Sequence, residues 1–274
     1  MINFNGDLIS NDQPIFKISN RVFKYGDGIF ETLKIANSKI IFFDDHYFRL
    51  MASMRMLRME IPPYLTLEFL IGEIEKTVAA NNFSKNVRVR VSVFRKDGGF
   101  YNPSSNEVDY VIEAQKFSII NNENYKVDLF KDYSLNSGLL STIKTTNRML
   151  NVVASIFAEE NNLDTCLLIN EKKNIVEAIH GNIFLVFGNT LITPLISEGC
   201  IKGIIRKKII QITKKHPDLK IEERAISPFE IIKADELFIT NSIIDVQAVS
   251  QYRKKKFTNT IANKIRELLK TEYT

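Results

Sequence analysis

Residues 86–94 alternate between apolar and polar side chains over almost their whole length. The apolar set is Val87, Val89, Val91 and Val93, and Arg88, Arg90 and Ser92 stand between them. Successive side chains of a strand point to opposite faces, so this pattern predicts a strand with one buried and one polar face. Two stretches with helical spacing precede it, at 44–58 and 66–81, so helices accompany the sheet.

Short strand patterns and helical patterns are mixed along the rest of the chain. Further strands are expected at 1–5, 13–17, 28–35, 39–43, 108–114, 125–130, 165–170, 174–177, 182–187, 190–193 and 236–240, and another leads into Lys144. Further helices are expected at 147–160, 203–215, 228–233 and 258–271. The polar stretch at 118–124 is the candidate linker. We therefore expect two α+β domains, at 1–117 and 125–274, with a cleft between them.

The composition is that of an ordinary globular protein. The 274 residues are 45% hydrophobic and 25% charged, and Cys166 and Cys200 lie in apolar patterns that favour buried thiols over a disulfide. No apolar run approaches the length needed to span a membrane, and the N-terminus lacks the features of a signal peptide, so a cytoplasmic location is expected. The net charge of +5 comes without a basic stripe interleaved with aromatics, which favours a small anionic substrate over nucleic acid.

Three features in a fixed order carry the chemistry. Lys144 stands before a predicted helix, Glu177 ends a predicted strand, and Gly203 opens a predicted helix. A lysine amine, a carboxylate and a helix N-terminus are what a pyridoxal-phosphate enzyme needs for its Schiff base, its pyridinium nitrogen and its phosphate. Each has an ordinary alternative: a solvated lysine, an edge-strand glutamate and a common loop glycine.

Two more candidates could meet the phosphate. The sequence Thr240-Asn241-Ser242 follows an apolar strand and offers hydroxyl groups, although a helix cap or turn is the alternative. Arg49 lies on the first helix and could supply a positive charge; otherwise it is a surface arginine paired with Asp45 at i,i+4.

In this order, the motifs resemble the class IV (fold type IV) pyridoxal-phosphate enzymes, a family of branched-chain and D-amino-acid aminotransferases and 4-amino-4-deoxychorismate lyases. The matching segments are 20–32, 46–50, 143–148, 177–184, 203–206 and 240–242. The resemblance implies a two-domain α+β fold with pyridoxal 5'-phosphate in the cleft between the domains. It also implies a homodimer in which the neighbouring subunit partly walls the substrate pocket.

The resemblance also assigns roles to individual residues. Lys144 would be the Schiff-base amine and proton shuttle, and Glu177 the partner of the pyridine nitrogen. The other implied cofactor contacts are Arg49, Asn182, Ile204, Ile205 and Ser242. The implied substrate contacts are Tyr25, Phe30 and Arg95, the last chosen over Arg88 and Arg90 as the arginine that holds a carboxylate.

Within the family, the motifs are most similar to those of the lyases. Arg148 stands where branched-chain aminotransferases tend to have tyrosine, and Thr32 where they tend to have glycine. A hydroxyl at Thr32 could relay a proton to the departing enolpyruvyl group, although a buried strand threonine is the alternative. The expected activity is thus 4-amino-4-deoxychorismate lyase, giving 4-aminobenzoate and pyruvate. The alternatives are a branched-chain or D-amino-acid aminotransferase and, more distantly, a non-catalytic pyridoxal-phosphate-binding protein.

Overall fold

The computed structural model describes residues 1–118 and 122–273. The chain divides into two compact units. The first comprises Met1–Ser118 together with the short segment Lys144–Asn147, and the second comprises the remainder. The expected linker at 118–124 includes residues 119–121, which lie outside the described residues. Lys144 was expected in the C-terminal domain, whereas its contacts group it with the first unit.

The first unit is built on a six-stranded sheet with the order β2-β1-β6-β5-β3-β4. The strands are β1 (Ile2–Phe4), β2 (Asp7–Ile9), β3 (Gly28–Ala36), β4 (Lys39–Ile40), β5 (Val87–Arg95) and β6 (Val108–Lys116). The alternation predicted for β5 is present: its valines are buried and the intervening residues 88, 90 and 92 are half-buried. The two long neighbours β3 and β6 pair with β5 along its whole length.

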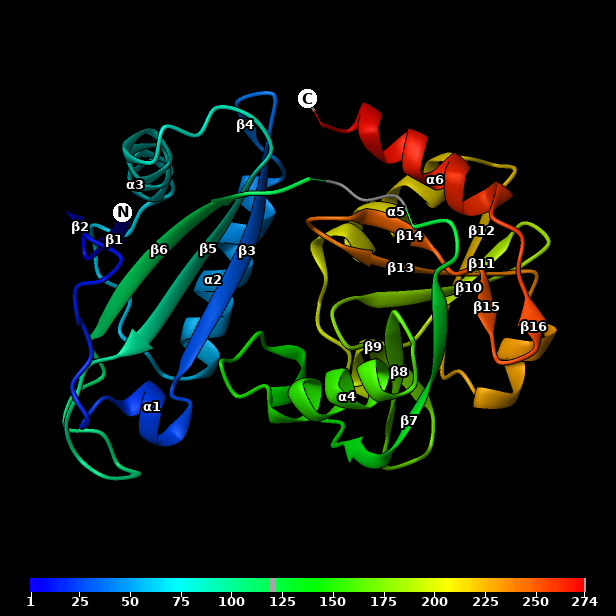
Figure 1. Cartoon of the computed structure of the whole chain (residues 1–274), viewed down its shortest axis with the longest axis horizontal. Coiled ribbons are helices and arrows are strands. Elements are labelled where there is room, and N and C mark those ends of the chain that lie inside the picture. Colours follow the sequence, from blue (N-terminus) through cyan, green and yellow to red (C-terminus); the bar gives the residue numbers. More distant parts are fainter. Residues whose placement is uncertain (119–121, 274) are drawn as a thin grey trace. The chain divides into compact units, whose positions relative to one another are not determined.

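Helices α2 (Phe43–Met56) and α3 (Leu67–Ala80) pack on one face of this sheet (Figure 1). This face carries Glu31 of β3, which bonds to α2, and Tyr110 of β6, whose ring lies 6.3 Å from that of Phe69 in α3. Because side chains alternate along a strand, Phe30 and Thr32 lie on the opposite face. The short helix α1 (Arg21–Tyr25) immediately precedes β3, and the Asn20 side chain caps its N-terminus.

The second unit contains two five-stranded sheets. One has the order β12-β11-β10-β13-β14 and the other β16-β15-β7-β8-β9. The strands of the first are β10 (Asn182–Phe187), β11 (Thr190–Thr193), β12 (Lys220–Glu223), β13 (Glu236–Asn241) and β14 (Asp245–Ala248). Those of the second are β7 (Lys126–Leu135), β8 (Thr165–Asn170), β9 (Ile175–Ala178), β15 (Gln251–Tyr252) and β16 (Lys255–Lys256). Apolar residues from both sheets, such as Leu167 and Leu237, form one buried cluster.

α-Helices accompany these sheets (Figure 1). They are α4 (Met149–Glu160), which packs on β7 and β8, α5 (Ile204–Lys215), which packs on β13, and α6 (Thr260–Thr271), which packs on β13 and β14. The α6 N-terminus is held by the buried Glu236, whose carboxylate accepts the N–H groups of Ile261 and Ala262, each at 2.9 Å. An anionic acceptor at this end of a helix is favourable because the first N–H groups have no partner within the helix.

The α+β prediction is confirmed, and two local predictions are wrong. Residues 13–17 form no strand; the N-terminal hairpin partner is β2 instead. The segment before Lys144 is a 3₁₀ helix (Leu140–Thr142) rather than a strand. The short helix expected at 228–233 is present with these bounds, as a 3₁₀ helix (Pro228–Lys233). Among the described residues, no helix has the length and hydrophobicity needed to cross a membrane.

Candidate active site

The segment that carries Lys144 lies beside the start of β3. The carbonyl of Lys144 accepts the N–H of Phe30 at 2.9 Å, and the N–H of Thr146 donates to the Gly28 carbonyl at 2.9 Å. The Thr146 hydroxyl also donates to the Gly26 carbonyl at 2.8 Å. The lysine therefore stands on a segment whose backbone is fixed by hydrogen bonds on both sides of it, and its side chain is half-buried.

The side chain of Lys144 contacts Phe30, which the sequence predicted as a substrate contact. Its ring centroid lies 4.3 Å from the Lys144 Nζ and 3.8 Å from the guanidinium carbon of Arg90. Thr32 follows two residues later on the same face of β3 and pairs with Arg90 in the sheet register. Lys144 and Arg90 thus meet at the Phe30 ring, and Thr32 lies on the same face of the sheet beside Arg90. Burial lowers the pKa of the Arg90 guanidinium, opposed by Glu113.

Arg49, expected as a phosphate contact or a surface arginine, meets the buried carboxylate of Glu31. Its Nε donates to Glu31 Oε1 at 2.7 Å and its Nη2 to Glu31 Oε2 at 2.5 Å, a bidentate pair. The Nδ1 of the buried His46 lies 2.7 Å from the same Oε2. The contacts fix the orientation of the Arg49 side chain on α2.

The charges of this trio follow from the same contacts. Burial alone would raise the pKa of Glu31, but Arg49 and His46 outweigh it and lower that pKa to about 2. Burial lowers the pKa of His46, against the opposing effect of Glu31. A neutral His46 that donates from Nδ1 to an ionised Glu31 is consistent with both directions.

Arg95 and Tyr25, expected as substrate contacts, are the last residues of β5 and α1 and lie near the start of β3. The Arg95 guanidinium donates to Asp27 at 3.0 Å, to Asn106 at 2.5 Å and to the carbonyls of residues 57 and 58 at 2.8 and 3.3 Å. These bonds commit the whole buried guanidinium to the loops. The Tyr25 ring lies 5.4 Å from that of the exposed Tyr101.

In the second unit, Glu177 lies on β9 and is 3% exposed. Its Oε2 accepts the backbone N–H of Ile201 at 2.9 Å. Ile201 belongs to the loop that leads into α5, so the predicted nitrogen partner and the predicted phosphate helix are linked directly through one backbone group.

Asn182 lies at the start of β10 and reaches the same loop. Its Nδ2 donates to the Ile201 carbonyl at 2.9 Å, and its Oδ1 lies against Gly203, the residue before α5. A Cβ at Gly203 would lie 1.9 Å from that Oδ1, so no larger residue fits there while Asn182 keeps its position. Helix α5 then begins at Ile204 and Ile205, with no side-chain cap on its first N–H groups.

Ser242 lies in the turn after β13 and is half-buried. The Asn241 side chain shapes this turn, because its Oδ1 accepts the N–H groups of residues 243 and 244 at 2.9 and 3.0 Å. Thr240 pairs with Asn182 in the sheet, and its buried Oγ1 has no hydrogen-bond partner among the described residues.

These observations fit pyridoxal phosphate in each unit taken by itself. The second unit offers an uncapped helix N-terminus, an orphaned hydroxyl at Thr240 and the buried carboxylate of Glu177. The first unit offers a half-buried lysine amine on a fixed segment and a well-oriented arginine. No group of histidine, cysteine and carboxylate side chains in the described ranges could hold a metal ion.

Several contributing residues had no role in the sequence prediction. Glu31 stood inside a quoted motif, and Arg90 was one of three candidate arginines, but only the contacts distinguish them. Ile201 acts through its backbone, which leaves no signal in the side-chain sequence. Thr240 stood next to Ser242 in the segment singled out as a source of hydroxyl groups.

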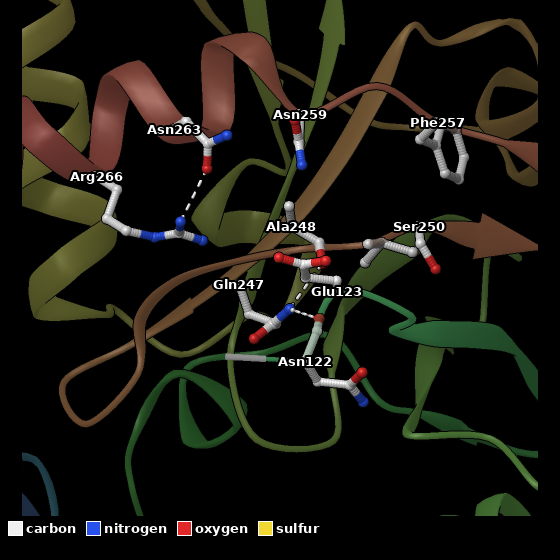
Figure 2. A pocket seen from close by; sticks show the side chains of 10 residues that line it. Asn122, Glu123, Gln247, Ala248, Ser250, Phe257, Asn259, Asn263 and Arg266 are labelled. Atoms are coloured by element: carbon white, nitrogen blue, oxygen red, sulfur yellow. Dashed lines mark hydrogen bonds between the residues drawn. The ribbon is translucent and has the colours of Figure 1, made fainter. Parts of the chain in front are cut away.

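A separate hollow of about 180 Å³ lies in the second unit between Gln247, Arg266 and their neighbours (Figure 2). The Gln247 amide donates to the carbonyls of Asn122 and Ala248, and Arg266 binds the Val246 carbonyl and the Asn263 side chain. None of the predicted site residues lines it, and its polar groups serve the fold. We therefore place the candidate site at the residues described above.

Comparison with known proteins gives a consistent result. The model of the family "Amino-transferase class IV" matches residues 28–252. A Methanocaldococcus jannaschii protein named "Putative branched-chain-amino-acid aminotransferase" is 25% identical over 99% of this chain and 94% of its own length. The D-alanine aminotransferase of Listeria monocytogenes is 25% identical over 90% of this chain and 85% of its own length.

A solved structure shows the same fold. It is a Legionella pneumophila protein described as a "Putative 4-amino-4-deoxychorismate lyase", which superposes with a TM-score of 0.88 at 22% identity and covers 96% of this chain and 97% of its own. The family model covers most of the sequence, from the start of β3 to β15. The chain therefore belongs to the class IV aminotransferases, the family of pyridoxal-phosphate enzymes that the sequence predicted.

Proposed function

We propose that this enzyme is a 4-amino-4-deoxychorismate lyase. The observation that carries the proposal is the position of Thr32, two residues along β3 from Phe30, whose ring contacts the Lys144 amine. The lyase reaction needs a proton at the departing enolpyruvyl group, and a strand hydroxyl close to the catalytic amine is suited to deliver it. Transamination has no such step.

The cofactor roles are assigned residue by residue. Lys144 supplies the amine that binds the cofactor, and bound pyridoxal phosphate withdraws electrons from the reacting carbon of the substrate. Glu177 would accept a hydrogen bond from the protonated ring nitrogen and keep that nitrogen charged. The phosphate dianion is held by Arg49, by Ser242 and by the first N–H groups of α5, at Ile204 and Ile205.

The substrate roles use the polar face of β3 and β5. Lys144 removes the proton from C4 of the substrate, and Thr32 relays this proton from the Lys144 ammonium to the methylene carbon of the departing group as the C–O bond breaks. The products are then 4-aminobenzoate and pyruvate. We assign the substrate carboxylate to Arg90 instead of Arg95, because Arg90 lies at Phe30 while the Arg95 guanidinium is committed to Asp27 and the neighbouring loops.

An aminotransferase is the second candidate, and the curated relatives favour it. Both relatives described above carry aminotransferase names, one for branched-chain substrates and one for D-alanine. Lys144, Glu177 and the phosphate contacts would serve transamination equally well, with Arg90 holding the α-carboxylate. A small anionic amino substrate is common to both candidates.

The homodimer implied by the sequence remains a prediction, which light scattering of the purified protein tests.

The deciding experiment compares two reactions in one preparation. The purified enzyme, loaded with pyridoxal phosphate, is given 4-amino-4-deoxychorismate, and 4-aminobenzoate is measured by chromatography. The visible spectrum of the bound cofactor is followed in parallel while L-leucine, L-glutamate and D-alanine are added in turn. Formation of 4-aminobenzoate, with no spectral conversion by the amino acids, supports the lyase. Conversion by an amino acid, with no 4-aminobenzoate formed, would establish the aminotransferase.

Substitution at position 32 then tests the role of the hydroxyl. Thr32→Val keeps the shape of the side chain and removes the hydroxyl, so lyase turnover should fall by about 10²-fold or more while cofactor binding persists. Thr32→Ser restores a hydroxyl and should recover most of the rate. Near-normal lyase turnover in Thr32→Val would reject the relay.

The amine at position 144 has its own test. Lys144→Ala should lose the visible band of the bound cofactor and all turnover without losing the fold, as judged by circular dichroism. A retained band would mean that another amine binds the cofactor.

A further inference from the structure

The peptide backbone of Ile201 is held from both sides by site residues. Its N–H donates to Glu177 Oε2 at 2.9 Å, and its carbonyl accepts the Asn182 Nδ2 at 2.9 Å. Both side chains are nearly buried, Glu177 at 3% and Asn182 at 4% exposure. Water therefore competes little for these bonds, and each of them restrains the position of the loop strongly.

The Asn182 side chain also sets where α5 begins. Its Oδ1 fills the space in which a Cβ of Gly203 would stand, at 1.9 Å from that position. Gly203 has ordinary backbone angles, φ −63° and ψ 138°, so any residue could adopt its conformation. The glycine is therefore required by the close approach of Asn182 and by nothing in its own backbone geometry.

The position of Asn182 is itself fixed by β10. The residue pairs with Thr240 across the sheet and is followed by four fully buried residues, 183–186. One short amide side chain on a rigid strand thus holds the loop that orients Glu177 and borders the first turn of α5.

We propose that Asn182 is a positioning residue and touches no atom of the cofactor. It acts through the Ile201 peptide on Glu177 and through contact with Gly203 on the start of α5. This inference rests on the proposed roles of Glu177 and of the α5 N-terminus. It replaces the direct cofactor contact that the sequence suggested for Asn182.

Asn182→Ala should have two measurable effects. The affinity for pyridoxal phosphate, titrated into the apoprotein, should fall by about tenfold, the equivalent of one buried hydrogen bond. The pH midpoint of the bound cofactor's visible absorbance should move in the same direction as in Glu177→Gln, because a loosened Glu177 holds the ring nitrogen less well. Asn189→Ala is the matched control: the residue is exposed in the turn that follows β10, and its substitution should change neither quantity.

The double variant Asn182→Ala, Glu177→Gln distinguishes positioning from a general loss of structure. If Asn182 acts through Glu177, adding Asn182→Ala to Glu177→Gln should move the pH midpoint no further. Equal shifts in both backgrounds, or a lowered thermal midpoint with no spectral change, would overturn the inference. If Glu177→Gln alone leaves the spectrum and turnover unchanged, the proposed role of Glu177 fails instead, so the two failures are distinguishable.

A second variant covers the case in which Asn182→Ala does not fold. Gly203→Ala displaces the Asn182 side chain without removing it and should reproduce the spectral shift and the loss of affinity. Combining it with Asn182→Ala removes the clash, so the double variant should bind the cofactor no more weakly than Asn182→Ala alone. Wild-type behaviour of Gly203→Ala would contradict the close contact on which the inference depends.

Discussion

The buried Glu31 offers the sharpest test of the electrostatics in the first unit. Its carboxylate bonds to Arg49 through both oxygens and to His46 through one. These partners outweigh burial and lower its pKa from 4.5 to about 2. A folded-state pKa below the unfolded value means stability that is present above pH 4.5 and lost as the pH falls towards 2. The difference corresponds to about 3 kcal/mol.

The perturbation is Glu31→Gln, which keeps the shape and removes the charge. At pH 7 it should destabilise the protein by about 3 to 5 kcal/mol, because Arg49 and His46 are left buried without their carboxylate. As the pH falls from 4.5 towards 2, the carboxylate is protonated first in the unfolded wild-type protein, so the difference between the two proteins should shrink by about 3 kcal/mol. Urea unfolding followed by circular dichroism between pH 7 and pH 2.5 measures this difference.

Glu107→Gln is the control for this measurement. Glu107 also pairs with a cation, Lys96 at 2.8 Å, but its side chain is 55% exposed. Its loss should change the free energy of unfolding by less than about 1 kcal/mol at any pH. A Glu31→Gln difference that stays constant from pH 7 to pH 2.5 would refute the assigned pKa, and a difference as small as that of the control would refute the buried pair.

Two further predictions concern the second unit. Burial raises the pKa of each thiol, Cys166 and Cys200, to about 12. A chromogenic thiol reagent at pH 8 should therefore label neither cysteine in the folded protein and both in urea. Rapid labelling of the native protein would contradict their burial. Glu236→Gln should weaken the hold on the N–H groups of Ile261 and Ala262 and cost about 1 kcal/mol, seen as faster hydrogen exchange along α6. Unchanged exchange in α6 would show that the carboxylate is not needed there.

The sequence predicts most of the long helices and strands because the hydrophobic residues within each of them recur with the period of that structure. The alternation of β5 and the helical spacing of α2 and α3 are local, and the structure begins and ends these elements within two residues of the predicted bounds. The short strands β12, β14, β15 and β16 have two to four residues and no period to detect. They exist because a neighbouring strand pairs with them, which a local pattern does not reveal.

The same division holds for the candidate site. The family motifs specify the residue types at positions 144, 177 and 203, so Lys144, Glu177 and Gly203 can be recognised from the sequence. The choice between Arg90 and Arg95 depends on distant partners such as Asp27, so three arginines on one strand and its end are equivalent in sequence. The sequence analysis chose Arg95 at the head of the loop, whereas the contacts of the two side chains favour Arg90.

The position of Lys144–Asn147 limits how this protein can be divided. The chain enters the second unit, returns for four residues that bond to Gly28 and Phe30, and leaves again, so three peptide connections join the units. A gene fragment that ends at Ser118 would encode the six-stranded sheet without the segment that completes the edge of β3. Protease cleavage near the first connection would leave β3 on one piece and the segment Lys144–Asn147, which bonds to it, on the other. Fragment complementation with this enzyme would need a cut elsewhere, such as the exposed turn at Gly188-Asn189, which lies within one unit.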